Sequence, residues 1–249
     1  MKRSHKKVRV VAVVPAAGLG KRFGAGKKKT MQDLCGKPVV IWSLQVLESV
    51  PEIEEIIPVL KVEDMEQGQR IFEEFNLSKI KRIAAGGKER QDSVQSGLKQ
   101  IVDDDCIVLI HDGVRPLIEK ELIDNAIREL FICSVSNAEN ESNGGIDGVI
   151  LGVPLKDTIK EAEDGTIKKT LKRDALWAVQ TPQVFLYKKL LAAYDQAEKE
   201  GFYATDDSAL VEHYGGKVRI VMGSYRNIKV TTPEDLDMAE FILGKTKTE

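Results

Sequence analysis

The stretch "VRVVAVVP", from Val8 to Pro15, is an almost unbroken run of apolar residues that ends directly before a glycine-rich segment. A run of this kind is typical of a strand that is buried on both faces of a parallel sheet. Similar runs recur along the chain, and we expect a strand in each of them. They span residues 54–61, 79–85, 106–112 and 147–154.

Segments with apolar residues three or four positions apart separate these runs, which is the spacing of an amphipathic helix. They span residues 39–49, 63–75, 90–102 and 119–131. Strands that alternate with helices in this way predict an α/β protein. The expected fold is a Rossmann-like, doubly wound, mostly parallel sheet with helices on both faces.

The second half of the chain has a different rhythm. Residues 155–177 alternate around Asp164-Gly165, which predicts a two-stranded hairpin that projects as an arm. We then expect a helix from 185 that ends at Gly201, a short helix over 206–216, a strand over 217–223, and a strand with a final helix over 227–243. Residues 134–147 are polar and turn-rich and predict a surface loop. One domain, 1–249, accounts for these elements, with the arm at about 154–175.

The composition is that of an ordinary soluble globular protein. With 37 basic and 39 acidic residues, the chain lacks the overall positive charge that binding to nucleic acid or an anionic membrane requires. Its three cysteines form no CxxC pair, and its three histidines lack partners at metal-ligand spacing, so we expect neither a disulfide framework nor a protein-held metal. A cytoplasmic location fits best.

The N-terminal segment has some features of a leader peptide, because basic residues precede an apolar run. That run is short and contains Arg9, and the residues after it suit a folded loop better. No stretch approaches the roughly twenty apolar residues of a membrane-spanning helix.

The segment "PAAGLGKRFGAGKKKT", from Pro15 to Thr30, follows the first strand. Ligands of open parallel sheets bind beyond the carboxyl ends of the strands. Glycine lets backbone N–H groups approach a phosphate, and the lysines and arginine of this segment can balance several negative charges. The segment therefore predicts a nucleoside triphosphate site, although a solvated flexible loop would have a similar composition.

Two common nucleotide motifs do not fit this segment. Gly18 and Gly20 begin a G-x-G-x-x-G pattern, but its last position is Phe23, and no acidic residue ends the second strand. The P-loop pattern fails because Lys21 stands where its first glycine belongs and Lys28 follows Lys27. These mismatches argue against a nicotinamide-dependent dehydrogenase and against a P-loop nucleotidase.

Other segments combine cations, glycines and carboxylates at strand ends. "AGGKERQDSV", residues 85–94, places glycine and cations before a helix N-terminus, which is a second anion-binding pattern. In "HDGVRP", Asp112 could accept hydrogen bonds from hydroxyl groups and Arg115 could grip a phosphate, unless the two form only a local ion pair. His111 is more readily explained as a packed structural residue.

Further along the chain, two segments have explanations in structure alone. Thr205 or Asp206 could be a helix N-cap, and Lys229 would lie in an apolar strand.

In combination, these segments resemble the bacterial cytidylyltransferases that act on 2-C-methyl-D-erythritol 4-phosphate in isoprenoid precursor synthesis. The resemblance spans nearly the whole chain and is most specific in "VVPAAGLGKRFGAG", "HDGVRP" and "NIKVT". It also includes "GGKERQDSV", "DTIK", "LKRDALWAVQTPQVF" and "ATDDSAL". The family implies CTP and a polyol phosphate as substrates, Mg²⁺ held mainly by the CTP phosphates, and a homodimer formed through the arm.

The resemblance also implies roles for individual residues. Those that would bind CTP are Ala16, Ala17, Gly18, Gly87, Lys88, Arg90 and Ser93. Those that would line the sugar-phosphate pocket are Asp112, Arg115, Thr181 and Thr205, with Thr158 from the partner's arm. Those that would stabilise the transition state or orient the attacking phosphate are Arg22, Lys29, Lys229 and the partner's Arg173.

The sequence departs from the family pattern at three places. Around Lys29 the usual Pro-Lys-Gln is replaced, so that Lys27 and Lys28 are alternatives to Lys29, although the spacing from Arg22 favours Lys29. Val114 stands where the family commonly has alanine before the arginine, and residues 134–147 form a longer loop.

Two alternative functions remain open from the sequence. One is a ribitol-5-phosphate cytidylyltransferase, whose relatives tend to have a double glycine where this chain has "PAAG". The other is a non-catalytic nucleotide-binding or regulatory module, which the altered "KKKTMQ" segment keeps open. Pyrophosphate release would distinguish these possibilities.

Overall fold

A seven-stranded sheet forms the centre of the molecule in the computed structural model, which describes residues 9–18, 29–136 and 145–246. The strand order is β11-β7-β10-β6-β1-β4-β5. All strands run in one direction except β10, which is antiparallel to both of its neighbours. The strands are β1 (Val10–Pro15), β4 (Ile53–Leu60), β5 (Ala84–Ala85), β6 (Ile107–Ile110), β7 (Gly148–Pro154), β10 (Trp177–Leu186) and β11 (Val218–Met222).

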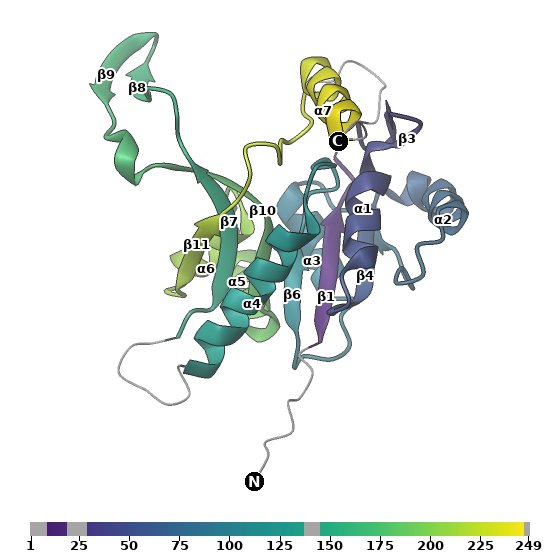
Figure 1. Cartoon of the computed structure of the whole chain (residues 1–249). Helices are drawn as coiled ribbons and strands as arrows, with labels where there is room; N and C mark the ends of the chain where they lie inside the picture. The colour runs from purple at the N-terminus through teal and green to yellow at the C-terminus, as the bar shows by residue number, and fades with distance from the viewer. Residues whose placement is uncertain (1–8, 19–28, 137–144, 247–249) are drawn as a thin grey trace.

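Helices cover both faces of this sheet (Figure 1). One face packs against α1 (Val39–Ser49), α2 (Met65–Glu74) and α4 (Lys120–Ser136). The other packs against α3 (Arg90–Leu98), α5 (Tyr187–Glu200) and α6 (Asp207–His213). The predicted Rossmann-like α/β fold is confirmed.

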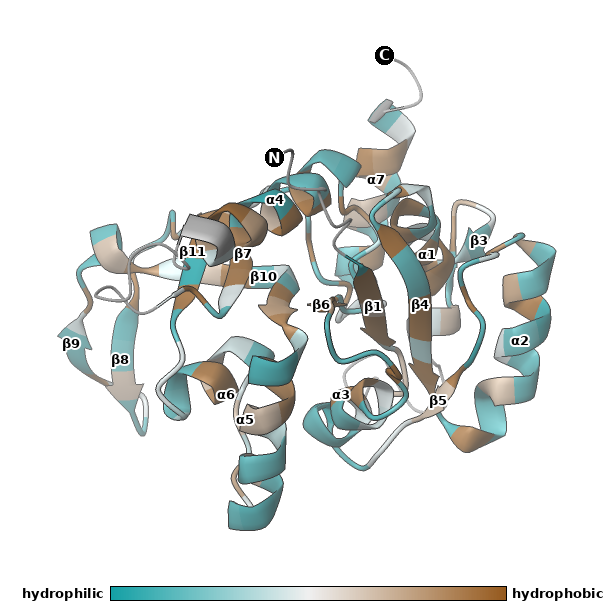
Figure 2. Ribbon diagram, turned by 90° about the horizontal axis from the view of Figure 1, so that it is seen from below, coloured by the Kyte–Doolittle hydropathy of each residue, from teal (hydrophilic) through white to brown (hydrophobic). Residues whose placement is uncertain are grey.

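The position of β1 in the sheet explains why its sequence does not alternate between polar and apolar residues, as that of a half-exposed strand would. Val10, Ala12 and Val14 belong to the core on one side of the sheet. Val11 and Val13 belong to the core on the other side. All five side chains are inaccessible to solvent. Both faces of β1 are therefore apolar, and Figure 2 shows it as a continuous hydrophobic strand at the centre of the fold.

The predicted hairpin is also present. Strands β8 (Lys160–Glu163) and β9 (Thr166–Thr170) pair around a turn in which Asp164 and Gly165 have φ angles of 49° and 76°. This left-handed conformation favours glycine. Every residue of the hairpin is exposed. Figure 1 shows it projecting from the end of β7 as an arm.

The remaining elements are short, apart from the last helix. A small hairpin pairs β2 (Asp33–Leu34) with β3 (Lys37–Pro38). The C-terminal helix α7 (Pro233–Thr246) packs against Leu34, Val39 and Leu117. Single 3-10 turns occur at Lys29–Met31, Val62–Asp64 and Arg173–Ala175.

Several predicted elements need correction. Only Ala84–Ala85 of the expected strand over 79–85 pairs as a strand, together with an isolated bridge at Ile80. Residues 227–230 are irregular, so the predicted apolar strand around Lys229 is wrong. Helix α4 continues to Ser136 and thus includes the start of the predicted loop, whose residues 137–144 lie outside the described part of the chain.

The structure also contains a strand that the sequence analysis did not predict. Strand β10 lies between β6 and β7 and is the one antiparallel member of the sheet. Its sequence, "WAVQTPQVFL", mixes buried polar and apolar residues because Gln180, Thr181 and Gln183 form hydrogen bonds in the interior.

Candidate functional site

A cavity of about 550 Å³ lies beyond the carboxyl ends of β1, β4, β5 and β6. The chain first adds strands on one side of β1 and then crosses to place β6 on its other side. This reversal is the topological switch point at which open α/β sheets bind ligands. The cavity is lined by Pro15, Ala16, Ala17, Gly18, Thr30, Lys61, Gly87, Lys88, Glu89, Arg90, Ser93, Asp112, Val114 and Lys229.

Backbone from two loops forms one side of this cavity. The loop after β1 is held by a hydrogen bond from the Ala16 N–H to the Val59 carbonyl (2.9 Å). The loop after β5 is held by a bond from the Gly86 N–H to the Leu60 carbonyl (2.7 Å). The two loops are in contact, since a Cβ on Gly86 would lie only 2.4 Å from the Cβ of Ala17. Glycine is thus required at Gly86 by the close approach of the loops.

Helix α3 begins at the cavity, directly after the glycines. The Ser93 hydroxyl accepts a hydrogen bond from the Gly87 N–H (3.1 Å) and donates to the Glu89 carbonyl (3.1 Å). The Asp92 carboxylate accepts from the Glu89 N–H (2.9 Å). These bonds fix the turn into the helix, whose N-terminal dipole favours an anion at this end.

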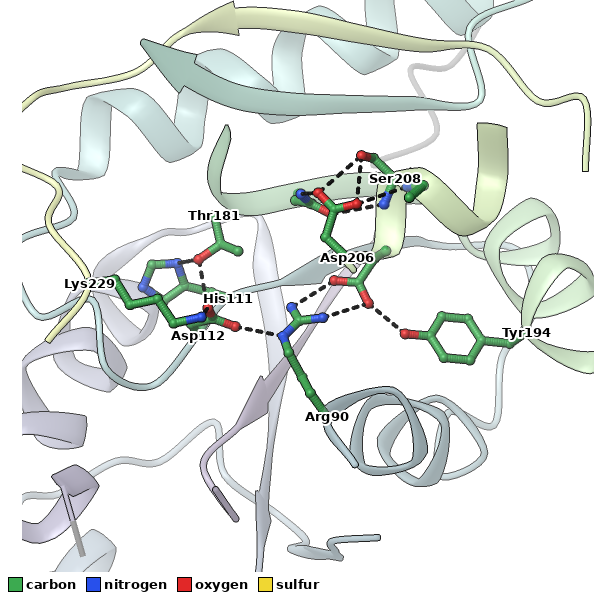
Figure 3. Close-up of polar contacts among 11 residues, drawn as sticks. Arg90, His111, Asp112, Thr181, Tyr194, Asp206, Ser208 and Lys229 are labelled. Carbon is green, nitrogen blue, oxygen red and sulfur yellow. Dashed lines mark hydrogen bonds and ion pairs between the residues drawn. The ribbon is translucent and has the colours of Figure 1, made fainter. Parts of the chain in front are cut away.

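A network of charged side chains contributes Arg90, Asp112 and Lys229 to the lining of the cavity. Figure 3 shows its contacts. The Asp112 carboxylate receives Arg90 Nε on one oxygen (3.0 Å) and Lys229 Nζ on the other (2.6 Å). Arg90 also donates through both terminal nitrogens to Asp207, at 3.2 and 2.8 Å. The Tyr194 hydroxyl donates to the same Asp207 carboxylate at 2.5 Å.

The charges in this network stabilise one another. Burial alone would raise the pKa of the Asp112 carboxyl, but Arg90 and Lys229 outweigh it and hold that pKa well below its ordinary value. Burial lowers the pKa of Arg90, and the carboxylates of Asp207 and Asp112 more than restore it. The cavity therefore presents an ionised carboxylate between two cations at neutral pH.

His111 supports the network from behind the cavity wall. Burial lowers its pKa to about 4, so the imidazole is neutral at pH 7. Its Nε2 lies 3.3 Å from the Arg115 carbonyl, which requires that Nε2 carry the proton. Nδ1 then accepts from the Thr181 hydroxyl (3.1 Å), and the Thr181 oxygen accepts from the Asp112 N–H (3.0 Å). The structural role predicted for His111 fits this arrangement.

The structure brings most of the predicted site residues together. All seven residues that the resemblance assigned to CTP line the cavity, as do Asp112 and Lys229. Asp112 pairs with Arg90 and Lys229 instead of forming the local ion pair with Arg115 that the sequence left open. The 227–230 segment is held beside the Asp112 loop by a bond from the Val230 N–H to the Val114 carbonyl (2.8 Å).

Five other predicted residues do not line the cavity in the described part of the chain. Arg115 is buried and donates to the Asn227 carbonyl (2.8 Å), which holds the segment that leads to Lys229. Thr205 is exposed and precedes the N-cap Asp206 of α6, whose carboxylate accepts from the Ala209 N–H. Thr158 and Arg173 are exposed residues of the arm region.

Thr181, the remaining predicted residue of the sugar-phosphate pocket, is buried behind Asp112. Arg22 lies outside the described residues, as does the side chain of Lys29.

Several residues of the site were not singled out from the sequence, among them the lining residues Pro15, Thr30 and Glu89. Three further residues are more informative. Lys61 follows β4 and lines the cavity, and its position at a strand end was a usable signal. Asp207 adjoins the predicted cap Asp206, and nothing in the sequence distinguishes its role from that of its neighbour. Tyr194 lies on the buried face of α5, where it reads as an ordinary core residue.

Comparisons with known proteins agree with this geometry. The family model described as "IspD: 2-C-methyl-D-erythritol 4-phosphate cytidylyltransferase" matches residues 10–245. The chain belongs to this family. A relative of that name from Geotalea uraniireducens is 42% identical over 97% of this chain and 100% of its own length. A relative from Clostridioides difficile, with the same name, is 43% identical over 95% of this chain and 94% of its own.

Solved structures of the family have the same fold. The 4-diphosphocytidyl-2C-methyl-D-erythritol synthase from Anaerococcus prevotii superposes with a TM-score of 0.80 at 32% identity, covering 96% of this chain and 97% of its own. The 2-C-methyl-D-erythritol 4-phosphate cytidylyltransferase from Francisella tularensis gives 0.74 at 26% identity, covering 94% and 99%. As a family member, the chain is a nucleotidyltransferase of isoprenoid precursor synthesis.

The described residues contain no group of three or more histidine, cysteine, aspartate or glutamate side chains that could hold a metal ion. Across the same ranges, no helix has the length and apolar character needed to span a membrane.

Proposed function

We propose that this chain transfers the cytidylyl group of CTP to 2-C-methyl-D-erythritol 4-phosphate and releases pyrophosphate. One observation carries the proposal. The cavity lining combines the Ala16–Gly18 backbone on one side with the charges of Lys229, Asp112 and Arg90. We place Arg90, which the resemblance assigned to CTP, with these charges because it is paired with Asp112. The first side suits a triphosphate, and the second suits the phosphate and hydroxyl groups of a polyol phosphate.

CTP would lie against the loops after β1 and β5. There the backbone at Ala17 and Gly18, together with the start of α3, would offer N–H donors to the phosphates. Main-chain groups that complement the exocyclic amine of cytosine would disfavour uracil, because uracil presents a carbonyl at that position and two acceptors would face each other.

The acceptor would bind on the Asp112 side. The ammonium group of Lys229 uses one of its three donors on Asp112 and has the others to offer to the acceptor phosphate. Asp112 is ionised and can accept hydrogen bonds from the acceptor's hydroxyl groups. Thr181 and Arg115 would act here by holding the Asp112 loop and the Lys229 segment.

The chemistry requires no covalent enzyme intermediate. An oxygen of the acceptor phosphate forms a bond to the α-phosphorus of CTP, while the bond from that phosphorus to the β-phosphate bridging oxygen breaks. Negative charge on the equatorial oxygens needs cations placed in advance, the role expected of Arg22 and Lys29. Mg²⁺ would enter with CTP, bound mainly by its phosphate oxygens.

We further propose a homodimer. Thr158 and Arg173 have expected roles in the pocket, yet they lie on the exposed arm of this chain and do not line its cavity. A second copy whose arm reaches across the interface would supply them. The exposed Ile167 on the arm gives such an interface an apolar contact.

Pyrophosphate release from the purified protein tests the proposal. CTP, UTP and ATP are each offered with 2-C-methyl-D-erythritol 4-phosphate and with ribitol 5-phosphate. We expect turnover with CTP and the erythritol phosphate. Preference for ribitol 5-phosphate would move the assignment to CDP-ribitol synthesis, and CTP binding without release of pyrophosphate would support a binding module.

A further inference from the structure

Asp207 is a fully buried carboxylate that lies behind the cavity instead of lining it. Both of its oxygens accept hydrogen bonds from Arg90, and one also accepts from the Tyr194 hydroxyl. A buried carboxylate is costly unless it is paired, and this one is paired with a side chain of the site.

The two ends of the Arg90 guanidinium have different partners. The terminal nitrogens face Asp207, and Nε faces Asp112. A two-point contact to a carboxylate fixes the plane of a guanidinium group. The direction of the Nε–H bond is therefore set by Asp207, and this bond is the one that reaches the cavity carboxylate (Figure 3).

Asp207 is itself held in place by the start of α6. Its neighbour Asp206 caps that helix and accepts a hydrogen bond from Gln183 of β10 (2.8 Å). The Ser208 N–H donates to the oxygen of the same Gln183 side chain (3.1 Å). The α6 N-terminus is thus attached to the central sheet on both sides of Asp207, which gives Arg90 a rigid anchor.

We propose that Asp207 is a positioning residue for the transfer reaction: it orients Arg90 so that Arg90 holds the Asp112 carboxylate in place beside Lys229. The inference rests on the proposed function. Loss of the Asp207 charge frees the terminal nitrogens of Arg90, which can then turn toward solvent or toward bound phosphate. Asp112 keeps Lys229 but loses the partner that fixes its other oxygen. The acceptor-binding side of the cavity then loses its fixed geometry.

A double-mutant cycle tests whether Asp207 acts through Arg90. Asp207→Asn removes the charge with little change in volume, and we expect it to lower kcat/KM for the acceptor about 10-fold. In the Arg90→Gln background the same substitution should change kcat/KM less than about 2-fold, because Asp207 acts through Arg90. Glu212→Gln is the matched control, since it removes the charge of an exposed residue on the same helix.

Tyr194→Phe provides a milder second variant. It removes one hydrogen bond to Asp207 and retains the buried ring, and the thermal midpoint of each variant reports folding separately. We expect a smaller loss of acceptor kcat/KM in the same direction, with KM for CTP nearly unchanged. Equal losses for Asp207→Asn in both backgrounds, or lower thermal stability with unchanged kcat/KM, would overturn the proposal.

Wild-type pyrophosphate release decides the proposed function separately. Should the wild type release none, the same cycle is measured on the dissociation constant of the erythritol phosphate by calorimetry. The same dependence on Arg90 is expected there, and additive effects would overturn the positioning role in that assay as well.

Discussion

The two sides of the cavity are built in different ways. On the side that we assign to the nucleotide, the lining consists mainly of backbone and small residues between Ala16 and Gly18 and at Gly87, with the exposed Lys88 beside them. On the side that we assign to the acceptor, the lining consists of charged side chains that are already paired, with Asp112 between Arg90 and Lys229. One side consists of backbone and small side chains, and the other is an ordered set of charges.

This difference indicates where the protein is organised before substrate arrives. The acceptor side is supported by buried groups such as His111 and Asp207, so its charges need little rearrangement when chemistry begins. Under the proposed function, the phosphates of CTP would bring their own charge and a bound Mg²⁺, so their side would need close backbone approach and cations. Substitutions on the two sides should therefore affect different kinetic constants.

Loss of Lys229 should have the largest effect. Lys229→Ala leaves Asp112 with Arg90 alone and removes the cation that meets the acceptor phosphate. We expect kcat/KM to fall about 1,000-fold, near the upper end for a single preorganised donor. Steady-state pyrophosphate release measures it, with Lys217→Ala as a control away from the cavity. A loss below about 10-fold would remove Lys229 from the acceptor side.

Lowering the pH should reduce the stability of the folded protein through His111, which supports the acceptor side. Its pKa is lowered to about 4 in the folded state from an ordinary value near 6.5, so the unfolded chain takes up the proton first as the pH falls. The stability contributed by neutral His111 is complete above about pH 6.5 and is lost progressively down to about pH 4, up to about 3 kcal/mol.

Urea unfolding at pH 7 and pH 4.5 measures this loss. His111→Gln keeps a donor toward the Arg115 carbonyl but does not titrate. We expect the variant to be less stable than wild type at pH 7 and to lose less stability on acidification. Parallel curves for the two proteins would show that His111 has no part in the acid sensitivity.

Lys29 tests the nucleotide side. Lys29→Ala should lower turnover at least about 100-fold with little loss of folding, because a cation at the α-phosphate would be used mainly in the transition state. Lys27→Ala and Lys28→Ala are matched controls within the same segment. If one of them shows the large loss and Lys29→Ala does not, the catalytic role belongs to that residue.

The sequence predicted the parts of the molecule that depend on local patterns. The apolar run of β1, the period of α1 and the Asp164-Gly165 turn each carry their own signal, and all three were confirmed. Strand β10 carried no such signal, because Gln180 and Gln183 are polar and their interior partners come from distant segments. The sequence around Lys229 likewise predicted a strand. In the structure this segment is irregular and is held by a hydrogen bond from the Val230 N–H to the Val114 carbonyl, in a distant part of the chain.

The candidate site shows the same division between features with a local sequence signal and features that depend on distant partners. The glycine loops and Asp112 lie directly at strand ends, so the order of strands was enough to bring them together. The link from Tyr194 through Asp207 to Arg90 joins α5, α6 and α3, and depends on side-chain directions that spacing does not encode. The sequence therefore predicted which residues line the cavity better than it predicted what holds them in place.

Substitution of Lys61 should have the smallest effect, and it tests most directly whether the two sides of the cavity act separately. It lines the cavity at the end of β4, on the opposite side of β1 from Asp112. A cation there can strengthen CTP binding equally before and during the reaction. Lys61→Ala should therefore raise KM for CTP about 3- to 10-fold and leave kcat unchanged. The exposed Lys81, outside the cavity lining, supplies the control Lys81→Ala. A fall in kcat, or a change in the acceptor KM instead, would show that the two sides are not separate.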